Sequence, residues 1–149
     1  MPQSLAQIYV HLVFSTKGRE ASIPAALQPR LHAYLAGAMN DIGCPAIRVG
    51  GMPDHVHILL RLSRTVTISD VAKTAKVESS KWMKDEGGVA NFAWQAGYGA
   101  FSVSASHVGA VTEYIANQER HHRVRTFQDE FRRLLELYQV EYDEAYVWD

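Results

Sequence analysis

The sequence has little of what defines several classes of protein. Its 149 residues include one cysteine, Cys44, so an intramolecular disulfide and a cysteine-rich zinc module are excluded. No apolar run approaches the ~20 residues that a membrane-spanning helix needs. The N-terminus also lacks the basic stretch that opens a signal peptide. We therefore expect a cytoplasmic protein that has no membrane partner.

The chain also lacks a strong excess of charge of either sign. Fifteen Lys and Arg stand against sixteen Asp and Glu, which leaves a formal net charge of −1. Residues 140–149 hold four acidic and no basic side chains, so residues 1–139 carry +3. This mild excess permits a nucleic-acid partner. With no repeat and no linker, we expect a single domain, 1–149, whose acidic and aromatic tail, 140–149, packs on the domain or on a dimer partner.

Hydrophobic periodicity and turn signals predict four strands and four helices. The expected strands are 8–15, 46–50, 55–62 and 99–105, and the expected helices begin near Leu27, Thr67, Ser106 and Thr126. The second and third strands are close enough to form a hairpin. The order β α β β α β α α indicates an α+β fold, a ferredoxin-like antiparallel sheet with helices on one face. The other face would stay available for chemistry or a partner.

The strand expected at 55–62 is the most regular segment of the chain. Its even positions, from Val56 to Leu62, are apolar and would face the core, whereas His55 and His57 share the opposite face. Residues two apart on a strand lie about 6.6 Å apart, so both imidazoles can reach one metal ion. A His-x-His pair is also common on surfaces by chance. Asp54 precedes the pair at an odd offset and is expected to shape the turn instead.

A candidate third ligand lies on the helix expected from residue 107 to about 121. Tyr114 and Gln118 are four residues apart, so they would share one helical face. A glutamine carbonyl is a hard oxygen ligand, and two imidazoles with oxygens suit Mg²⁺ or Mn²⁺. A tyrosine one turn away would lie beside a metal-bound phosphate. The alternative for Tyr114 is a half-buried packing role with a satisfied hydroxyl.

These two motifs together resemble a known family. His55-Val56-His57 after Pro53-Asp54, followed by Tyr114-Ile-Ala-Asn-Gln118, is similar to the histidine–hydrophobe–histidine (HUH) single-tyrosine transposases, and more narrowly to the IS200/IS605 insertion-sequence group. The similarity extends over essentially the whole chain. It includes the segments 9–17, 94–102 and 127–131.

The resemblance implies an enzyme that cleaves and transfers single-stranded DNA at the hairpin ends of its element. His55, His57 and Gln118 would then hold Mg²⁺ or Mn²⁺, and Tyr114 would be the nucleophile that becomes joined to a DNA 5′-phosphate. The HUH motif would lie on a central strand. The family is typically dimeric, and the tyrosine helix of one subunit completes the site of the other.

Three other interpretations stay open. A domesticated nickase that acts on repeat hairpins would have the same site. A non-catalytic module for single-stranded nucleic acid would share the strand–helix order, and Gly97-Tyr98-Gly99 overlaps an aromatic RNA-binding signature. Its flanking basic and aromatic positions, however, are occupied by Ala96 and Ala100. A His-x-His phosphoesterase acting on small molecules would need neither a tyrosine nor DNA.

The DNA-binding surface is predicted from basic and aromatic side chains. Basic candidates for contacts to the DNA backbone are Arg61, Lys73, Lys76, Lys81, Arg120 and Arg123. Residues that either stack on bases or pack in the core are Trp94, Tyr98 and Phe101. We expect His121 and His122 to be exposed or to face DNA rather than to bind metal. His11 is either a neighbour of the site or a satisfied buried histidine.

Overall fold

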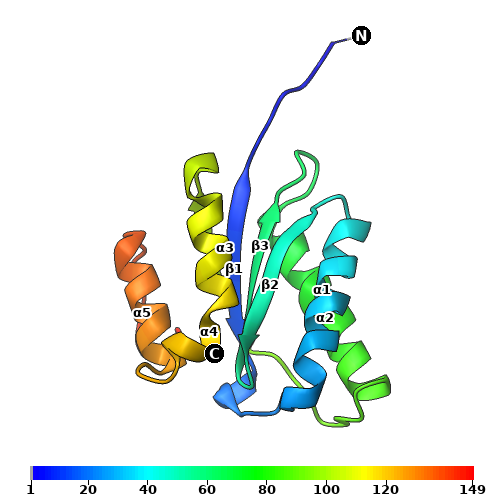
Figure 1. The fold of residues 1–149 in the computed structure, drawn as a ribbon, viewed down its shortest axis with the longest axis vertical. Helices are drawn as coiled ribbons and strands as arrows, with labels where there is room; N and C mark the ends of the chain where they lie inside the picture. The colour runs from blue at the N-terminus through cyan, green and yellow to red at the C-terminus, as the bar shows by residue number, and fades with distance from the viewer. Residues whose placement is uncertain (1) are drawn as a thin grey trace.

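The computed structural model describes residues 2–149 and shows a four-stranded antiparallel sheet with helices on both faces (Figure 1). The strands are β1 (Tyr9–Ser15), β2 (Ala46–Met52), β3 (His55–Arg61) and β4 (Gly99–Val103), in the spatial order β2-β3-β1-β4. The helices are α1 (Gln28–Asp41), α2 (Ile68–Asp85), α3 (Val108–Ala116), α4 (Gln118–His121) and α5 (Phe127–Leu137). The predicted α+β class, the antiparallel sheet and the β2–β3 hairpin are confirmed. Within the described residues, no helix combines the length and the apolar character needed to cross a membrane.

One face of the sheet holds a closed apolar core under α1 and α2. Alternate residues of β1 and β3 point into it, as the pattern from Val56 to Leu62 predicts. The buried strand residues on this face are Val10, Leu12, Phe14, Val56, Ile58 and Leu60. Leu31 and Leu35 from α1, with Val71 and Met83 from α2, pack against them. Cys44 is also buried in this core and is one of its small apolar members.

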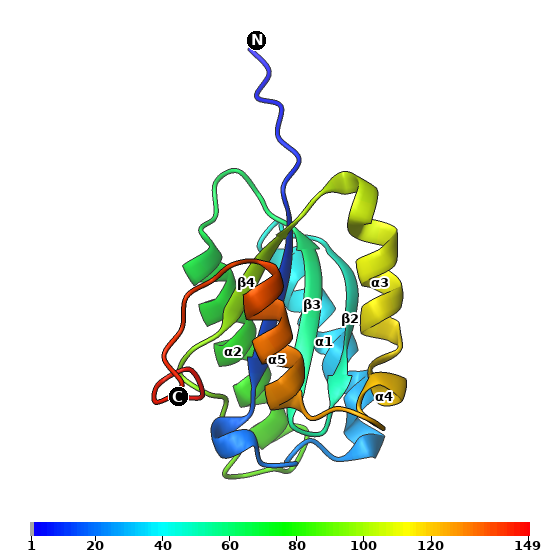
Figure 2. The same ribbon diagram turned by 90° about the vertical axis from the view of Figure 1, so that its left-hand side faces the viewer.

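The other face is also covered, so the expectation that helices lie on one face is wrong in this respect. In Figure 2, α5 lies in front of the sheet, while α1 and α2 lie behind it. Phe127 and Phe131 of α5 pack on Val13, and Ile115 of α3 packs on Leu59. The two central strands therefore bury side chains on both faces, which a strict in–out alternation does not predict. The histidines of β3 lie between these two apolar contacts rather than on an open surface.

Three of the four expected helix starts agree with the structure, at Leu27, Thr67 and Thr126. Thr67 accepts a hydrogen bond from the Asp70 amide at 3.1 Å, and Thr126 accepts one from the Asp129 amide at 3.2 Å. Ser106, by contrast, lies within a short 3₁₀ turn (Ala105–His107) and caps no helix. The single helix expected to about residue 121 ends at Ala116. Asn117 adopts φ −103° and ψ 25° there and separates α3 from α4.

Two glycines let the helices of the second face approach the sheet closely. A Cβ atom at Gly50 in β2 would lie 2.6 Å from the Ile115 carbonyl oxygen of α3. A Cβ atom at Gly99 in β4 would lie 2.6 Å from the ring of Phe131 in α5. A side chain at position 50 would push α3 outward, whereas one at position 99 would displace the Phe131 ring.

The acidic tail packs against α5 and the loop before β4. Trp148 contacts the Phe127–Phe131 cluster, and the guanidinium of Arg132 lies 5.1 Å from its ring centre. Arg132 also pairs with Glu144, and the Gly97 amide donates to the Asp149 carbonyl at 2.9 Å. These contacts hold the tail against the middle of α5.

Candidate active site

His55 and His57 lie side by side on the α5 face of β3. Both side chains are fully buried, and their ring centres are 5.1 Å apart. The strands β1 and β2 flank β3 on both sides, so the backbone that carries the pair is fixed by hydrogen bonds to two neighbours. Two imidazoles are therefore held in one orientation in a water-poor space.

α3 brings Tyr114 to this pair, and α4, after the break at Asn117, brings Gln118. The Gln118 side chain is 2% exposed, and its Oε1 lies 3.0 Å from His55 Nε2. The Tyr114 ring stands edge-on to His57, with ring centres 5.9 Å apart. The structure thus brings together all four residues that the sequence analysis assigns to the site.

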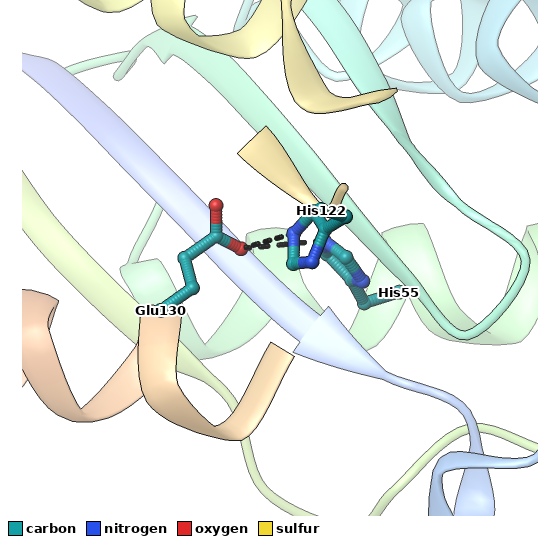
Figure 3. A group of neighbouring side chains, drawn as sticks. All are labelled: His55, His122 and Glu130. Atoms are coloured by element: carbon teal, nitrogen blue, oxygen red, sulfur yellow. Dashed lines mark hydrogen bonds and ion pairs between the residues drawn. The ribbon is translucent and has the colours of Figure 1, made fainter. Parts of the chain in front are cut away.

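Glu130 and His122 also belong to this cluster, and the sequence analysis missed both. Glu130, from α5, is 3% exposed, and its Oε1 lies 3.0 Å from His57 Nε2 and 3.1 Å from His122 Nε2. Figure 3 shows this carboxylate pointing at the rings of His122 and His55. The expectation that His122 is exposed is wrong, because its side chain is 8% exposed. Its Nε2 also lies 3.1 Å from the Gln118 oxygen.

A signal for Glu130 was present in the sequence. It lies within the apolar stripe of α5, three residues after Phe127 and next to Phe131, so it points toward the sheet. An acidic side chain on the buried face of an amphipathic helix requires a partner. A signal existed for His122 as well, because it lies four residues after Gln118, the spacing that places two residues on one helical face.

A second layer of residues fixes the histidine rings. His55 Nδ1 donates to Asp54 Oδ1 at 2.7 Å, and His57 Nδ1 lies 2.7 Å from His11 Nε2. With both Nδ1 atoms engaged, the Nε2 atoms face the centre of the cluster. Asp54 therefore orients a site residue as well as shaping the turn, where its carbonyl accepts from the Thr16 amide. His11 is both a buried histidine and a neighbour of the site.

The carboxylate of Glu130 dominates the electrostatics of the site. Burial alone would favour its neutral form, but the imidazoles of His57, His122 and His55 outweigh burial and hold its pKa well below the ordinary range. Tyr114 donates a hydrogen bond to Glu130 Oε2. Burial and the negative charge of Glu130 together raise the pKa of Tyr114, so its phenol is protonated at neutral pH.

The histidines respond differently to the same surroundings. Burial opposes the charged form of His55, but its hydrogen bonds to Asp54 and Glu130 prevail and raise its pKa to about 9. Burial and the nearby His57 lower the pKa of His11 to about 3, so His11 is neutral at pH 7. Burial also lowers the pKa of His57, although Glu130 opposes that shift.

The donor atoms of the cluster suit a divalent cation. Two ligands at right angles and ~2.1 Å from one ion are ~3.0 Å apart. The Nε2 and oxygen atoms of this cluster are separated by 3.0–3.3 Å, and the ligand atoms of His55, His122 and Glu130 all lie within 4.8 Å of one another. Imidazole nitrogens together with amide and carboxylate oxygens form a donor set that Mn²⁺ and Mg²⁺ accept. The residues present therefore fit the metal that the sequence predicts.

A groove between α3 and α5 leads to the tyrosine. It has a volume of about 630 Å³, and Tyr114, Glu130 and His11 lie at its inner end. Arg125 and Arg133 line it as well. Because the two histidines of β3 have no exposed surface, this groove offers a substrate a route to the phenol oxygen.

The basic residues predicted to bind DNA are spread over both faces. Lys73 and Lys81 are exposed on α2, which lies on the opposite side of the sheet from the histidines. Lys76, on the same helix, donates to the carbonyls of residues 95, 96 and 97, so its ammonium group is engaged within the chain. Arg120 and Arg123 are exposed and follow Gln118 directly.

Of the remaining candidates, Arg61 lies away from the cluster and His121 lies beside it. Arg61 ends β3, four residues or about 13 Å along the strand from His57. Trp94 and Phe101 are buried and pack in the core, whereas Tyr98 is 40% exposed. His121 stacks on Tyr114, with ring centres 4.6 Å apart.

Comparison with protein families matches residues 4–118 to the family described as "Transposase IS200 like". Because this segment is most of the chain, the protein belongs to the IS200-like transposase family. The matched segment contains His55, His57, Tyr114 and Gln118 and ends before Glu130. No curated protein matches the chain.

Two solved structures share the fold, each with a TM-score of 0.60. One is described as a candidate transposase from Deinococcus radiodurans and is 23% identical. The match covers 79% of this chain and 98% of that chain. The other is described as a REP-associated tyrosine transposase bound to a REP hairpin and is 13% identical. The match covers 82% of this chain and 73% of that chain. At these identities the likeness shows the fold alone.

Proposed function

We propose that the protein is a metal-dependent transposase that cleaves and rejoins single-stranded DNA through Tyr114. The observation that carries this proposal is the position of the phenol, which is hydrogen-bonded to Glu130 beside the cluster of His55, His57 and Gln118. In the reaction, a bond forms between the Tyr114 oxygen and the phosphorus, and the bond from phosphorus to the 3′ oxygen breaks. The products are a 5′-phosphotyrosine and a free 3′-hydroxyl, which can later reverse the step on another strand.

The chain's own residues would prepare this step. His55, His57 and Gln118 would hold Mg²⁺ or Mn²⁺, and His122 and Glu130 contact these ligands. The bound ion would act as a Lewis acid toward the scissile phosphate. Glu130 holds the hydroxyl of Tyr114 in place. Forming a phenolate from an ordinary tyrosine at pH 7 costs about 4 kcal/mol.

The proposed DNA partner is a hairpin at the end of a mobile element. The family membership supports DNA as the substrate, and one structural relative is described as bound to a REP hairpin. That relative also favours a second candidate function, a nickase that acts on chromosomal repeat hairpins with the same chemistry. The two differ in which hairpin is cleaved, so matched oligonucleotides from each source distinguish them.

The proposed assembly is a homodimer in which the tyrosine segment of one subunit completes the site of the other. In the single chain, Tyr114 already reaches the histidines of its own sheet. Mixing a His57→Ala variant with a Tyr114→Phe variant tests this arrangement. Activity restored in the mixture indicates action across the dimer, and no restoration indicates action within one subunit.

The direct test is a covalent adduct. Labelled single-stranded element ends are incubated with the full chain and Mg²⁺ or Mn²⁺, and a denaturant-resistant protein–DNA band is expected. EDTA should abolish the band, and Tyr114→Phe should bind the hairpin without forming it. An adduct that persists in Tyr114→Phe would exclude this nucleophile. DNA binding that is indifferent to EDTA, without any adduct, would favour a non-catalytic binding module.

A further inference from the structure

The two oxygens of Glu130 face two different parts of the site. Oε1 lies among the imidazoles, 3.0 Å from His57 Nε2 and 3.3 Å from His55 Nε2. Oε2 accepts hydrogen bonds from the Tyr114 hydroxyl and from Gln118 Nε2, the latter at 3.0 Å. A single buried carboxylate therefore contacts the histidines, the amide and the phenol at once.

The contact with Gln118 determines which end of the amide faces the histidines. An amide has an oxygen end that binds cations and an NH₂ end that repels them. The NH₂ end of Gln118 donates to Glu130, so its oxygen points to His55 and His122, at 3.0 and 3.1 Å. Supporting hydrogen bonds of this kind orient metal ligands in proteins.

The contact with Tyr114 fixes the phenol relative to the same carboxylate. Tyr114 and Glu130 come from α3 and α5, which rest on opposite edge strands of the sheet, at Gly50 in β2 and Gly99 in β4. This hydrogen bond joins the two helices directly above the histidines. Movement of Glu130 would therefore displace the phenol and the amide together.

Building on the function proposed above, we infer that Glu130 is a positioning residue that couples the metal site to the tyrosine. It orients the Gln118 oxygen toward the cation and holds the Tyr114 hydroxyl at a fixed distance from it. Glu130 lies outside the segment that matches the family, so this inference rests on the contacts in the structure alone.

Glu130→Gln is the informative substitution, because it keeps the shape and removes the symmetry of the two oxygens. If the new NH₂ group faces the histidines, it repels the cation. If it faces Gln118, two NH₂ groups meet and the Gln118 amide must rotate. Either orientation disturbs the metal site. In both orientations Tyr114 also loses its charged acceptor, so its hydrogen bond is weakened or broken.

Two measurements on the full chain, made without DNA, report the metal site and the Tyr114 phenol separately. Isothermal titration with Mn²⁺ reports the metal site, and the ¹⁹F resonance of Tyr114 in fluorotyrosine-labelled, metal-free protein reports the phenol. Tyr114→Phe identifies that resonance among the seven tyrosines. For Glu130→Gln we expect the Mn²⁺ dissociation constant to rise about 10- to 100-fold and the resonance to shift. Glu78→Gln, at an exposed position on α2 on the other face of the sheet, is the matched control and should change neither.

A swap of the two groups separates positioning from general disruption. The double variant Gln118→Glu with Glu130→Gln again places one carboxylate and one amide in contact. It should recover Mn²⁺ affinity to within a few fold, while the Tyr114 resonance stays shifted, because the phenol then faces an NH₂ group. The double variant also carries the test if Glu130→Gln alone does not fold.

The inference is overturned if Glu130→Gln leaves either the Mn²⁺ affinity or the Tyr114 resonance at the wild-type value. The carboxylate would then position only the metal site or only the phenol. It is also overturned if the swap recovers no Mn²⁺ affinity. A wild-type chain that binds Mn²⁺ but never forms an adduct would contradict the proposed function. The two DNA-free readouts would still decide the role of Glu130.

Discussion

The two faces of the sheet are built on opposite principles. Ile58 and His57 are neighbours in β3, and both are fully buried. Ile58 points into an apolar core under α1 and α2, where close packing and the hydrophobic effect stabilise the fold. His57 points into a cluster that contains a carboxylate, an amide and further imidazoles.

The apolar face of the sheet supplies stability, and the polar face carries the chemistry. Burying polar and charged groups is costly even when each has a partner, and such clusters often contribute little net stability. The face under α5 tolerates this cost because the other face supplies the stabilising core. Single substitutions on the two faces should therefore affect different properties, metal and DNA chemistry on one and the free energy of unfolding on the other.

The largest expected effect is the loss of metal binding in His57→Ala. Losing a direct ligand should cost more than the roughly 10- to 100-fold in affinity that a supporting residue costs. Mn²⁺ affinity should therefore fall by more than about 100-fold, and the DNA adduct should disappear. Calorimetry and a denaturing gel measure the two quantities. A His57→Ala protein that binds Mn²⁺ at wild-type affinity would show that the cluster is not a metal site.

Ile58→Ala tests the opposite face at the neighbouring position. Removal of a buried isoleucine side chain typically lowers the free energy of unfolding by about 2–5 kcal/mol, which denaturant titration measures. Mn²⁺ affinity of the folded fraction should stay within about twofold of wild type. Ile58→Val removes less of the same side chain and is expected to lower the free energy of unfolding by about 0.5–1.5 kcal/mol. A large loss of Mn²⁺ affinity in Ile58→Val would show that the two faces are not independent.

Gly50→Ala should disturb the site face through packing alone. The added methyl group would meet the Ile115 carbonyl and push α3 away from the sheet. Overpacking of this kind costs about 1–3 kcal/mol, and the displacement should weaken Mn²⁺ binding because Gln118 follows α3. Gly37→Ala, in α1 with open space around it, is the control. It should be neutral or stabilising by up to about 1 kcal/mol.

DNA binding should depend on the face that carries the tyrosine. Replacing Arg120 and Arg123 by alanine should lower the affinity for single-stranded DNA. It should also reduce the slope of log K against log salt by about 0.7 for each phosphate that the protein no longer neutralises. Filter binding over a salt series measures this. Lys73→Ala with Lys81→Ala, on the far side of the sheet, is the matched control. An equal reduction of the slope in this control would show that DNA also contacts α2.

The smallest effect concerns acid stability and arises beside β2, at His32 in α1. Burial, aided by the charge of Arg48, lowers the pKa of His32 to about 4, and within residues 2–149 its Nε2 is buried without a partner. Its unfolded pKa is near 6.5, so the unfolded state takes up the proton first. The stability due to neutral His32 is therefore present above pH 6.5 and is lost as the pH falls toward 4. His32→Gln should lose less thermal stability between pH 7 and 4 than wild type does, and His107→Gln, at an exposed position, should not differ from wild type.

The alternating pattern of β3 predicted the core and the histidine pair correctly because both depend on local geometry. The threonine caps at Thr67 and Thr126 were predictable for the same reason. Glu130 was not identified, because its contact with His55 joins positions 75 residues apart and depends on how α5 crosses the sheet. The break at Asn117 was also missed, since no glycine or proline occurs between residues 110 and 125 to mark it. The periodicity of α5 places Glu130 on the buried face of the helix. It does not say which residues of distant segments Glu130 contacts there.

Gly50 and Gly99 differ in how replaceable they are. At Gly99 the two nearest atoms belong to the Phe131 side chain, so a shorter residue at position 131 can relieve the closest contacts of a methyl group. At Gly50 the nearest atom is a main-chain oxygen, which no substitution removes. Among natural variants of this protein, we therefore expect residues 99 and 131 to change together and residue 50 to remain glycine throughout.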